Sequence, residues 1–173
     1  MKKINFWIIV SDHLRTLRDA RNGSTYYFDM VIFFAIPSIL AVMAFGAGLS
    51  VAEDYWSLSV TFFGIFIALL LNMQVAVFGI HQKSTIRKAA FELTEAGENE
   101  ERLKRTLIAE LNASLSYLTL VSTISLIISF CAFIWKTNQW IMVSVSIFFS
   151  AHFALTLLMV LKRSHILFKR ELS

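Results

Sequence analysis

The chain has 173 residues, of which 57% are hydrophobic and 16% are charged, and its formal net charge is +4 at pH 7. Ordinary soluble domains carry roughly 45–50% apolar and about 25% charged residues, so this composition excludes that class and favours an integral membrane protein. The single cysteine, Cys131, excludes an intramolecular disulfide and a cysteine-based metal site.

The N-terminal segment, residues 1–24, is predicted to form an amphipathic interfacial helix. One face of residues 4–21 carries apolar side chains at three- and four-residue spacing: Trp7, Val10, Leu14 and Leu17. A basic amphipathic helix with an aromatic anchor can lie in the headgroup plane. Packing against the protein's own cytosolic hairpin is an equal alternative. The apolar run is short and no small-residue cleavage site follows it, so we do not interpret it as a signal peptide.

Four later stretches lack Asp, Glu, Lys and Arg and are long enough to cross a bilayer. A hydrocarbon core of about 30 Å requires roughly 20 apolar residues in a helix. Hydrocarbon also offers no water to exposed peptide groups, so such stretches must be helical. We therefore predict an all-α integral membrane protein, one domain over residues 1–173, with four transmembrane helices at 30–51, 57–80, 113–135 and 140–161.

Two of these stretches carry residues suited to close helix packing. The first has a stripe of small residues, and the third has hydroxyl residues within one arc of about 120°. We expect these residues to pack helices in a homo-oligomer: Ala41, Ala44, Gly48, Thr119, Ser122, Ser125 and Ser129. The functional alternative to packing is a water-lined path along these hydroxyls.

The polar insert at residues 81–112 is predicted to form a cytosolic helical hairpin that continues the second and third spans. We place its turn at Ala96-Gly97-Glu98-Asn99, with Gly97 as terminator and Asn99 as helix cap. The tip carries acidic residues with no base between them: Glu92, Glu95, Glu98, Glu100 and Glu101. We expect this acidic tip to dock a cytosolic protein by charge complementarity. The alternative is a solvated connection without a partner.

Basic residues predict the orientation. Of the 16 Lys and Arg, all but Lys136 lie in the N-terminal segment, the insert or the tail at 162–173. Lys and Arg in short loops mark the cytosolic side, so both termini and the insert should face the cytosol. Aromatic residues fit interfacial belts at the outer ends (Tyr55, Trp56, Trp135 and Trp140) and at the inner ends (Tyr26, Tyr27 and Tyr117).

The intramembrane polar residues are Asn72, Gln74 and His152. A histidine at the midplane is a functional candidate because its exposure to lipid is costly. A histidine bonded to a neighbouring helix, for example to the hydroxyl stripe, is the favoured alternative, and interhelical bonds suffice for Asn72 and Gln74. No catalytic motif, phosphate loop or metal-ligand spacing is present. We expect no enzymatic activity, no cofactor, no metal and no direct binding of nucleic acid.

Two function classes stay open. One is a membrane-embedded sensor or scaffold that holds a cytosolic partner. The other is a small oligomeric pore or membrane-disrupting effector.

The whole-chain plan resembles the KwaA family, the membrane subunits of the bacterial Kiwa anti-phage defence system. The likeness lies in four predicted spans, the basic lead-in HLRTLRDARNGS, the long insert and the minimal outer loops. It covers the whole chain but is one of topology, so no site residue is carried over. The resemblance implies a homo-oligomer, tetrameric in the family, in the bacterial inner membrane. It also implies that the protein senses phage attachment or injection and couples to a cytosolic DNA-binding partner, KwaB.

Overall fold

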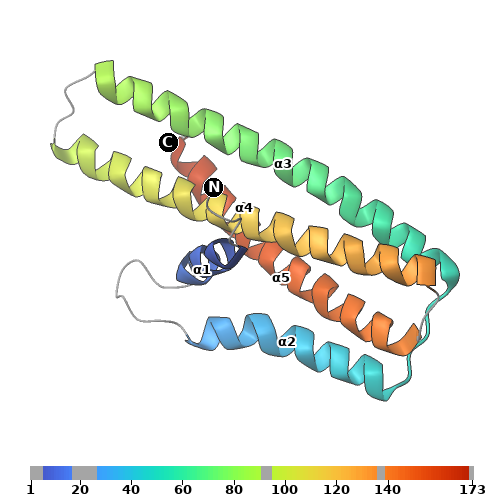
Figure 1. Ribbon diagram of the computed structural model, residues 1–173. Coiled ribbons are helices and arrows are strands. Elements are labelled where there is room, and N and C mark those ends of the chain that lie inside the picture. Colours follow the sequence, from blue (N-terminus) through green and yellow to red (C-terminus); the bar gives the residue numbers. More distant parts are fainter. Residues whose placement is uncertain (1–5, 17–26, 91–94, 136–138, 172–173) are drawn as a thin grey trace.

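The computed structural model describes residues 6–16, 27–90, 95–135 and 139–171, and the regular elements in these ranges are all α-helices (Figure 1). They are α1 (Phe6–Thr16), α2 (Tyr27–Gly46), α3 (Glu53–Ala90), α4 (Glu95–Trp135) and α5 (Gln139–Glu171). The all-α class is therefore confirmed.

The four long helices alternate in direction. α3 and α4 lie side by side, α5 packs against α4, and α2 packs against α5 (Figure 1). The short helix α1 packs against α4. Phe153 of α5 also contacts the aromatic rings of α3, with its centroid 5.1 Å from that of Phe66. Helices α3, α4 and α5 thus enclose the main core, and α2 covers one side of α5.

Three helices contain apolar segments long enough to cross a membrane: Asp54–Gly79, Arg105–Trp135 and Trp140–Lys162. These segments include the predicted second, third and fourth spans, apart from Ile80. The described apolar part of α2, Val31–Gly46, is shorter. At 1.5 Å per residue it covers about 24 Å, against a hydrocarbon core of about 30 Å.

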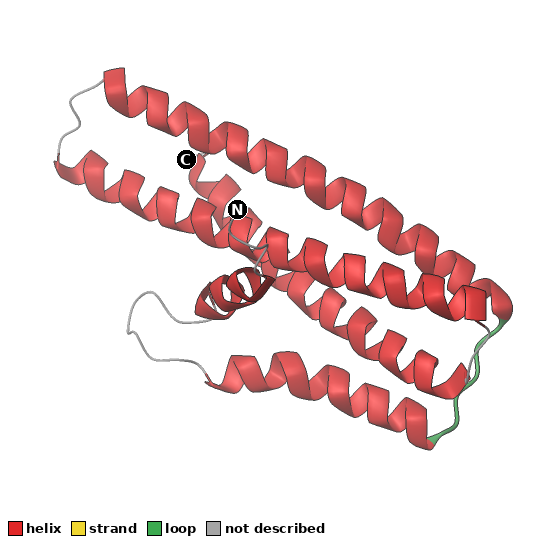
Figure 2. Ribbon diagram, in the orientation of Figure 1, coloured by secondary structure: helices red, strands yellow, loops and turns green. Residues whose placement is uncertain are grey.

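The end of α2 differs from the prediction, which continued the first span to Val51. Gly48 has φ 59, in the left-handed region. The amide of Gly48 donates to the carbonyl of Phe45 at 3.1 Å, and the amide of Leu49 donates to that of Ala44 at 3.2 Å. This pattern is a Schellman motif, which terminates a helix. The helix therefore stops at Gly46, and a short loop leads to α3 (Figure 2).

The buried side of α4 follows a spacing of three and four residues over most of its length. The seam consists of Ile108, Leu111, Leu115, Leu118, Ser122, Ser125, Ser129 and Ala132, all buried. This spacing is that of left-handed helix packing, in which each buried residue sits between residues of the facing helix. Large side chains fill the first half of the seam and small ones the second half. The neighbouring helices can therefore approach most closely toward Trp135.

The predicted turn of the charged insert is wrong. α4 begins at Glu95, so Gly97 and Asn99 lie within its first turns rather than in a connection. Acidic side chains near a helix N-terminus interact favourably with its dipole, and four of the first seven residues are glutamates. The run of acids thus favours helix here despite Gly97. The residues that join α3 to α4, 91–94, lie outside the described residues.

Helix α1 packs on the bundle with one face. Ile9 and Val10 pack against the core and His13 is buried, whereas Trp7 and Ile8 are exposed. Of the predicted apolar face, Val10 therefore points inward and Trp7 outward. α1 thus packs against α4, and its His13 stacks on Tyr117, which lies in the predicted third span and not in the hairpin at 81–112. The interfacial placement stays a prediction. The side chains of Leu14 and Leu17 lie outside what is described.

Candidate functional site

His152 is the most constrained polar residue within the apolar segments. It is buried, with 3% of its surface exposed. Its Nδ1 lies 3.1 Å from the carbonyl oxygen of Phe33 on α2, and its Nε2 lies 2.7 Å from the hydroxyl of Tyr117 on α4. The carbonyl can only accept, so Nδ1 donates. In the neutral ring Nε2 then accepts the proton of the Tyr117 hydroxyl.

Pro37 explains why the carbonyl of Phe33 is free to accept. Within an α-helix this carbonyl would bond to the amide of the residue four positions later. That residue is Pro37, which lies inside α2 and has no amide proton. A buried carbonyl without a donor is costly, so the imidazole of His152 replaces the missing backbone bond. The bond ties α2 to α5 at one defined position.

Tyr117 connects this pair to the N-terminal helix. Its ring stacks on that of His13, with the ring centroids 4.0 Å apart and the planes 3° from parallel. His13 is 2% exposed and Tyr117 is 7% exposed. One tyrosine thus contacts α1 with its ring and α5 with its hydroxyl. We call His13, Tyr117 and His152 the histidine–tyrosine cluster.

Aromatic rings enclose His152 on the remaining sides. Phe34 of α2 lies 5.1 Å from it between ring centroids, and Phe148 of α5 lies parallel to it at 6.1 Å. These rings supply no further hydrogen-bond acceptor. The cluster therefore joins helices α1, α2, α4 and α5.

The hydroxyl stripe on α4 bonds mainly to its own helix. The hydroxyls of Thr119, Ser122 and Ser125 donate to the carbonyls of Leu115, Leu118 and Val121 at 2.8–2.9 Å. Ser122, Ser125 and Ser129 are buried inside one copy of the chain. The three serines act as small residues in the packing seam, and none of the hydrogen bonds described above reaches His152.

The small-residue stripe of the first span is divided. Ala44 is 3% exposed and is buried within the chain, whereas Ala41 is half-buried beside α5. Gly48 lies beyond the helix end in the left-handed conformation, so it is a terminator and not part of a helix face. Its assignment to a packing stripe is therefore wrong, because the Schellman turn moves it off the helix.

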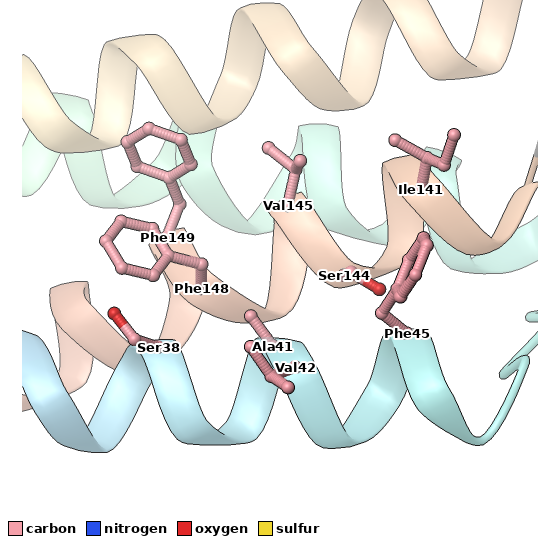
Figure 3. A pocket seen from close by; sticks show the side chains of 9 residues that line it. All are labelled: Ser38, Ala41, Val42, Phe45, Ile141, Ser144, Val145, Phe148 and Phe149. Carbon is pink, nitrogen blue, oxygen red and sulfur yellow. The ribbon is translucent and has the colours of Figure 1, made fainter.

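A groove of about 500 Å³ lies between α2 and α5, toward the end at which α2 terminates (Figure 3). Phe45 of α2 and Ile141, Phe148 and Phe149 of α5 line it, together with Ala41. The lining is almost wholly apolar, and the hydroxyl of Ser144 is turned back to the carbonyl of Trp140 at 2.8 Å. Such an apolar lining suits contact with hydrocarbon chains.

Asn72 and Gln74 lie in different surroundings, as their two-residue separation on α3 predicts. The Nε2 of Gln74 donates to the hydroxyl of Ser116 on α4 at 3.0 Å, so Gln74 forms an interhelical bond. Asn72 is exposed and forms no hydrogen bond within the described part of the chain.

The acidic tip is described only in its backbone. Glu95, Glu98, Glu100 and Glu101 lie in the first two turns of α4, and their side chains lie outside the described residues, as does Glu92 as a whole. Its role as a docking surface stays a prediction.

Sequence reasoning missed two members of the cluster. Tyr117 was assigned to the inner interfacial belt, and His13 was not singled out. One signal was available for His152, since Pro37 leaves a buried helix carbonyl in need of a donor.

Within the described ranges no group of three His, Cys, Asp or Glu side chains gathers that could hold a metal ion. Comparisons with known protein families, with characterised proteins and with solved structures found no match for this chain.

Proposed function

We propose that the chain is a membrane-embedded sensor or scaffold subunit that holds a cytosolic partner protein. One observation carries this proposal: α3 and α4 run without a break from apolar segments into charged extensions. α3 continues from Gly79 to Ala90, and α4 begins at Glu95, ahead of the apolar segment that starts at Arg105. Each extension reaches about 15 Å at 1.5 Å per residue.

Continuous helices can transmit a displacement, because the helix backbone is rigid over such lengths. The extension of α4 begins with the acidic residues 95–101, and the extension of α3 ends at Ala90. In the proposed topology α2 is the first of four spans and both termini and the extensions face the cytosol. α2 has 20 residues, which covers about 30 Å. The proposed docking surface is the acidic tip.

The histidine–tyrosine cluster supports a sensing role. It joins α2, α4 and α5 at one point and places α1 against α4. A change in the position of α2 would alter the bond between Phe33 and His152, and Tyr117 contacts His152 directly. The same tyrosine holds α1, so α1 and α2 are linked through the bonded pair of Tyr117 and His152.

The pore-forming alternative has less support. A water-lined path would need hydroxyls that face an open lumen, whereas those of Ser122 and Ser125 are buried and bond to their own backbone. The resemblance to the KwaA family favours a role in bacterial anti-phage defence. We extend the proposal accordingly to a homo-oligomer in the inner membrane, with a KwaB-like DNA-binding partner.

Capture of the partner tests the proposal. The tagged chain, purified from host membranes at low salt, should bring down one cytosolic protein. Changing Glu98, Glu100 and Glu101 to Lys should reduce that capture about tenfold or more, because like charges then face the partner. Changing the same residues to Gln should give a smaller loss. Asp54→Lys, an exposed charge at the opposite end of α3, is the control and should have no effect. Undiminished capture by the Lys variant would exclude the tip.

Orientation is tested separately. In a Cys131→Ala background, a cysteine at Glu53 should react with a membrane-impermeant thiol reagent in intact cells, and one at Gly97 should not. Labelling of Gly97→Cys in intact cells would reverse the topology and remove the basis for a cytosolic docking surface.

A further inference from the structure

Asn72 presents an amide side chain on the outer surface of the bundle, within an apolar segment. It lies about two turns, or about 10 Å along the axis, before Gly79, where the segment ends. The segment Asp54–Gly79 is about 39 Å long, against a hydrocarbon core of about 30 Å. Asn72 therefore lies within the hydrocarbon. Its short side chain cannot reach the headgroups in the way that lysine or arginine can.

Two other exposed polar residues of the spans, Thr61 and Thr123, bond within their own helices. The hydroxyl of Thr61 donates to the carbonyl of Ser57 at 3.0 Å, and that of Thr123 donates to the carbonyl of Thr119 at 2.8 Å. Asn72 forms no such bond in the described part of the chain. An amide in lipid without partners is costly, because two donors and one acceptor lose their water. The protein therefore needs a neighbour that both donates and accepts at this depth.

The surface around Asn72 permits a second helix to come close. Ala68 and Ala76 lie one turn to either side of it on the same face, and both are exposed. A Cβ atom added at Gly79 would meet nothing within 4 Å. Small residues next to an Asn allow two helix backbones to approach until the amides can bond. Larger exposed residues flank this stripe: Leu69 and Val75 lie about 60° to either side of Asn72, and Leu71 lies about 100° away. Ile65 lies on the same face about two turns before Asn72.

We propose that this face of α3 binds the same face of a second copy, with the two Asn72 amides bonded to each other. An amide is complementary to itself, since each can donate to the other's oxygen and accept from its nitrogen. All copies insert in one orientation, so a symmetry axis along the membrane normal brings residues of equal depth together. The inference rests on the membrane-spanning arrangement proposed above. It moves the contact between copies from the predicted α2 stripe to α3.

Cross-linking of the full-length chain in membranes tests the contact. In a Cys131→Ala background, Ala68→Cys and Ala76→Cys should form disulfide-linked dimers under mild oxidation. Leu71→Cys, at a similar depth on another exposed face, should form at least fivefold less of the disulfide-linked dimer. Equal cross-linking at all three positions, or a product whose mass shows a different protein, would overturn the inference. All three changes are at exposed positions, and the comparison uses equal amounts of inserted protein.

Substitution of the amide gives an independent readout. Asn72→Leu should raise the dissociation constant of the dimer in mild detergent about threefold to thirtyfold, the range measured for interhelical hydrogen bonds. Asn72→Gln should retain association. Gln74→Leu, which removes a bond inside one copy, is the control for general destabilisation. An Asn72→Leu dimer as tight as the wild type would mean that the amide makes no contact between copies.

Failure of the inference can be told from failure of the proposed function. If Gly97→Cys is shielded in intact cells and the partner is captured, but Ala68→Cys and Ala76→Cys do not cross-link, only the α3 contact is wrong. If Gly97→Cys is labelled from outside, the arrangement in the membrane is wrong as well.

Discussion

Tyr117→Phe is the most informative single substitution, because it removes one contact of the histidine–tyrosine cluster and keeps the other. The hydroxyl that donates to His152 Nε2 at 2.7 Å is lost. The ring that stacks on His13 at 4.0 Å remains. No cavity of appreciable size is created, so the loss of folding stability measures the contribution of the hydrogen bond.

The expected loss of stability is about 0.6–2 kcal/mol. A buried acceptor left without its donor costs about 1–3 kcal/mol. Interhelical bonds within membranes average about 0.6 kcal/mol, with a maximum of about 1.7. Tyr117→Ala should cost about 3–5 kcal/mol, as for other buried aromatic truncations, because ring packing is lost as well. Only the alanine variant should release α1.

Two assays check this reasoning. Equilibrium unfolding in mixed micelles, followed by circular dichroism, gives the free energies. Reactivity of a cysteine at Ile9, which packs on the core, reports the docking of α1, and it should rise for Tyr117→Ala but not for Tyr117→Phe. Substitution of His152 by Leu completes a double-mutant cycle. If the losses of stability caused by Tyr117→Phe and His152→Leu were additive, the hydrogen bond would contribute nothing. The cluster would then stabilise the bundle by packing alone.

Two further pairs of variants test the backbone arguments. Pro37→Ala restores an amide to the carbonyl that His152 now satisfies, so His152→Ala should cost about 1 kcal/mol less in that background than in the wild type. The same unfolding assay checks this, and equal costs would show that the proline plays no part. Gly48→Ala should destabilise by about 1–2 kcal/mol, because its φ is 59. Gly46→Ala, inside the last turn with open space around it, should stabilise by up to about 1 kcal/mol, and thermal unfolding should show the opposite signs.

The helical class and the three long apolar segments could be predicted because they depend on residue properties summed along the chain. The segments 57–80, 113–135 and 140–161 each fall almost wholly within a helix of the structure. Helix ends depend instead on local backbone bonds. Gly48 ends α2 before the apolar run ends, whereas Gly97 does not stop α4, because the acidic residues around it favour a helix N-terminus.

The site was less accessible to prediction because its contacts join distant parts of the chain. His152 was identified as an intramembrane polar residue with a bonded alternative, and the structure shows it bonded to neighbouring helices. Its acceptor, Phe33, is 119 positions away, and the acceptor is a backbone atom. Side-chain type gives no indication of such a partner. Trp56 was likewise assigned to an interfacial belt but is 5% exposed, because it packs with Ala132 and Val143.

The two halves of the α4 seam differ in how they hold the bundle together, and this difference bears on function. Toward Trp135 the seam residues are small, and the hydroxyls of Ser122 and Ser125 bond within α4, so van der Waals packing holds this half. Toward Arg105 the seam carries large leucines, and Tyr117 adds a directed bond to α5 and a stacked contact to α1. Directed contacts thus concentrate in the half of α4 that continues into the charged extension. A displacement of α2 that reaches His152 would therefore act on the half of α4 that continues into the charged extension. The proposed sensor with a cytosolic partner requires such a connection.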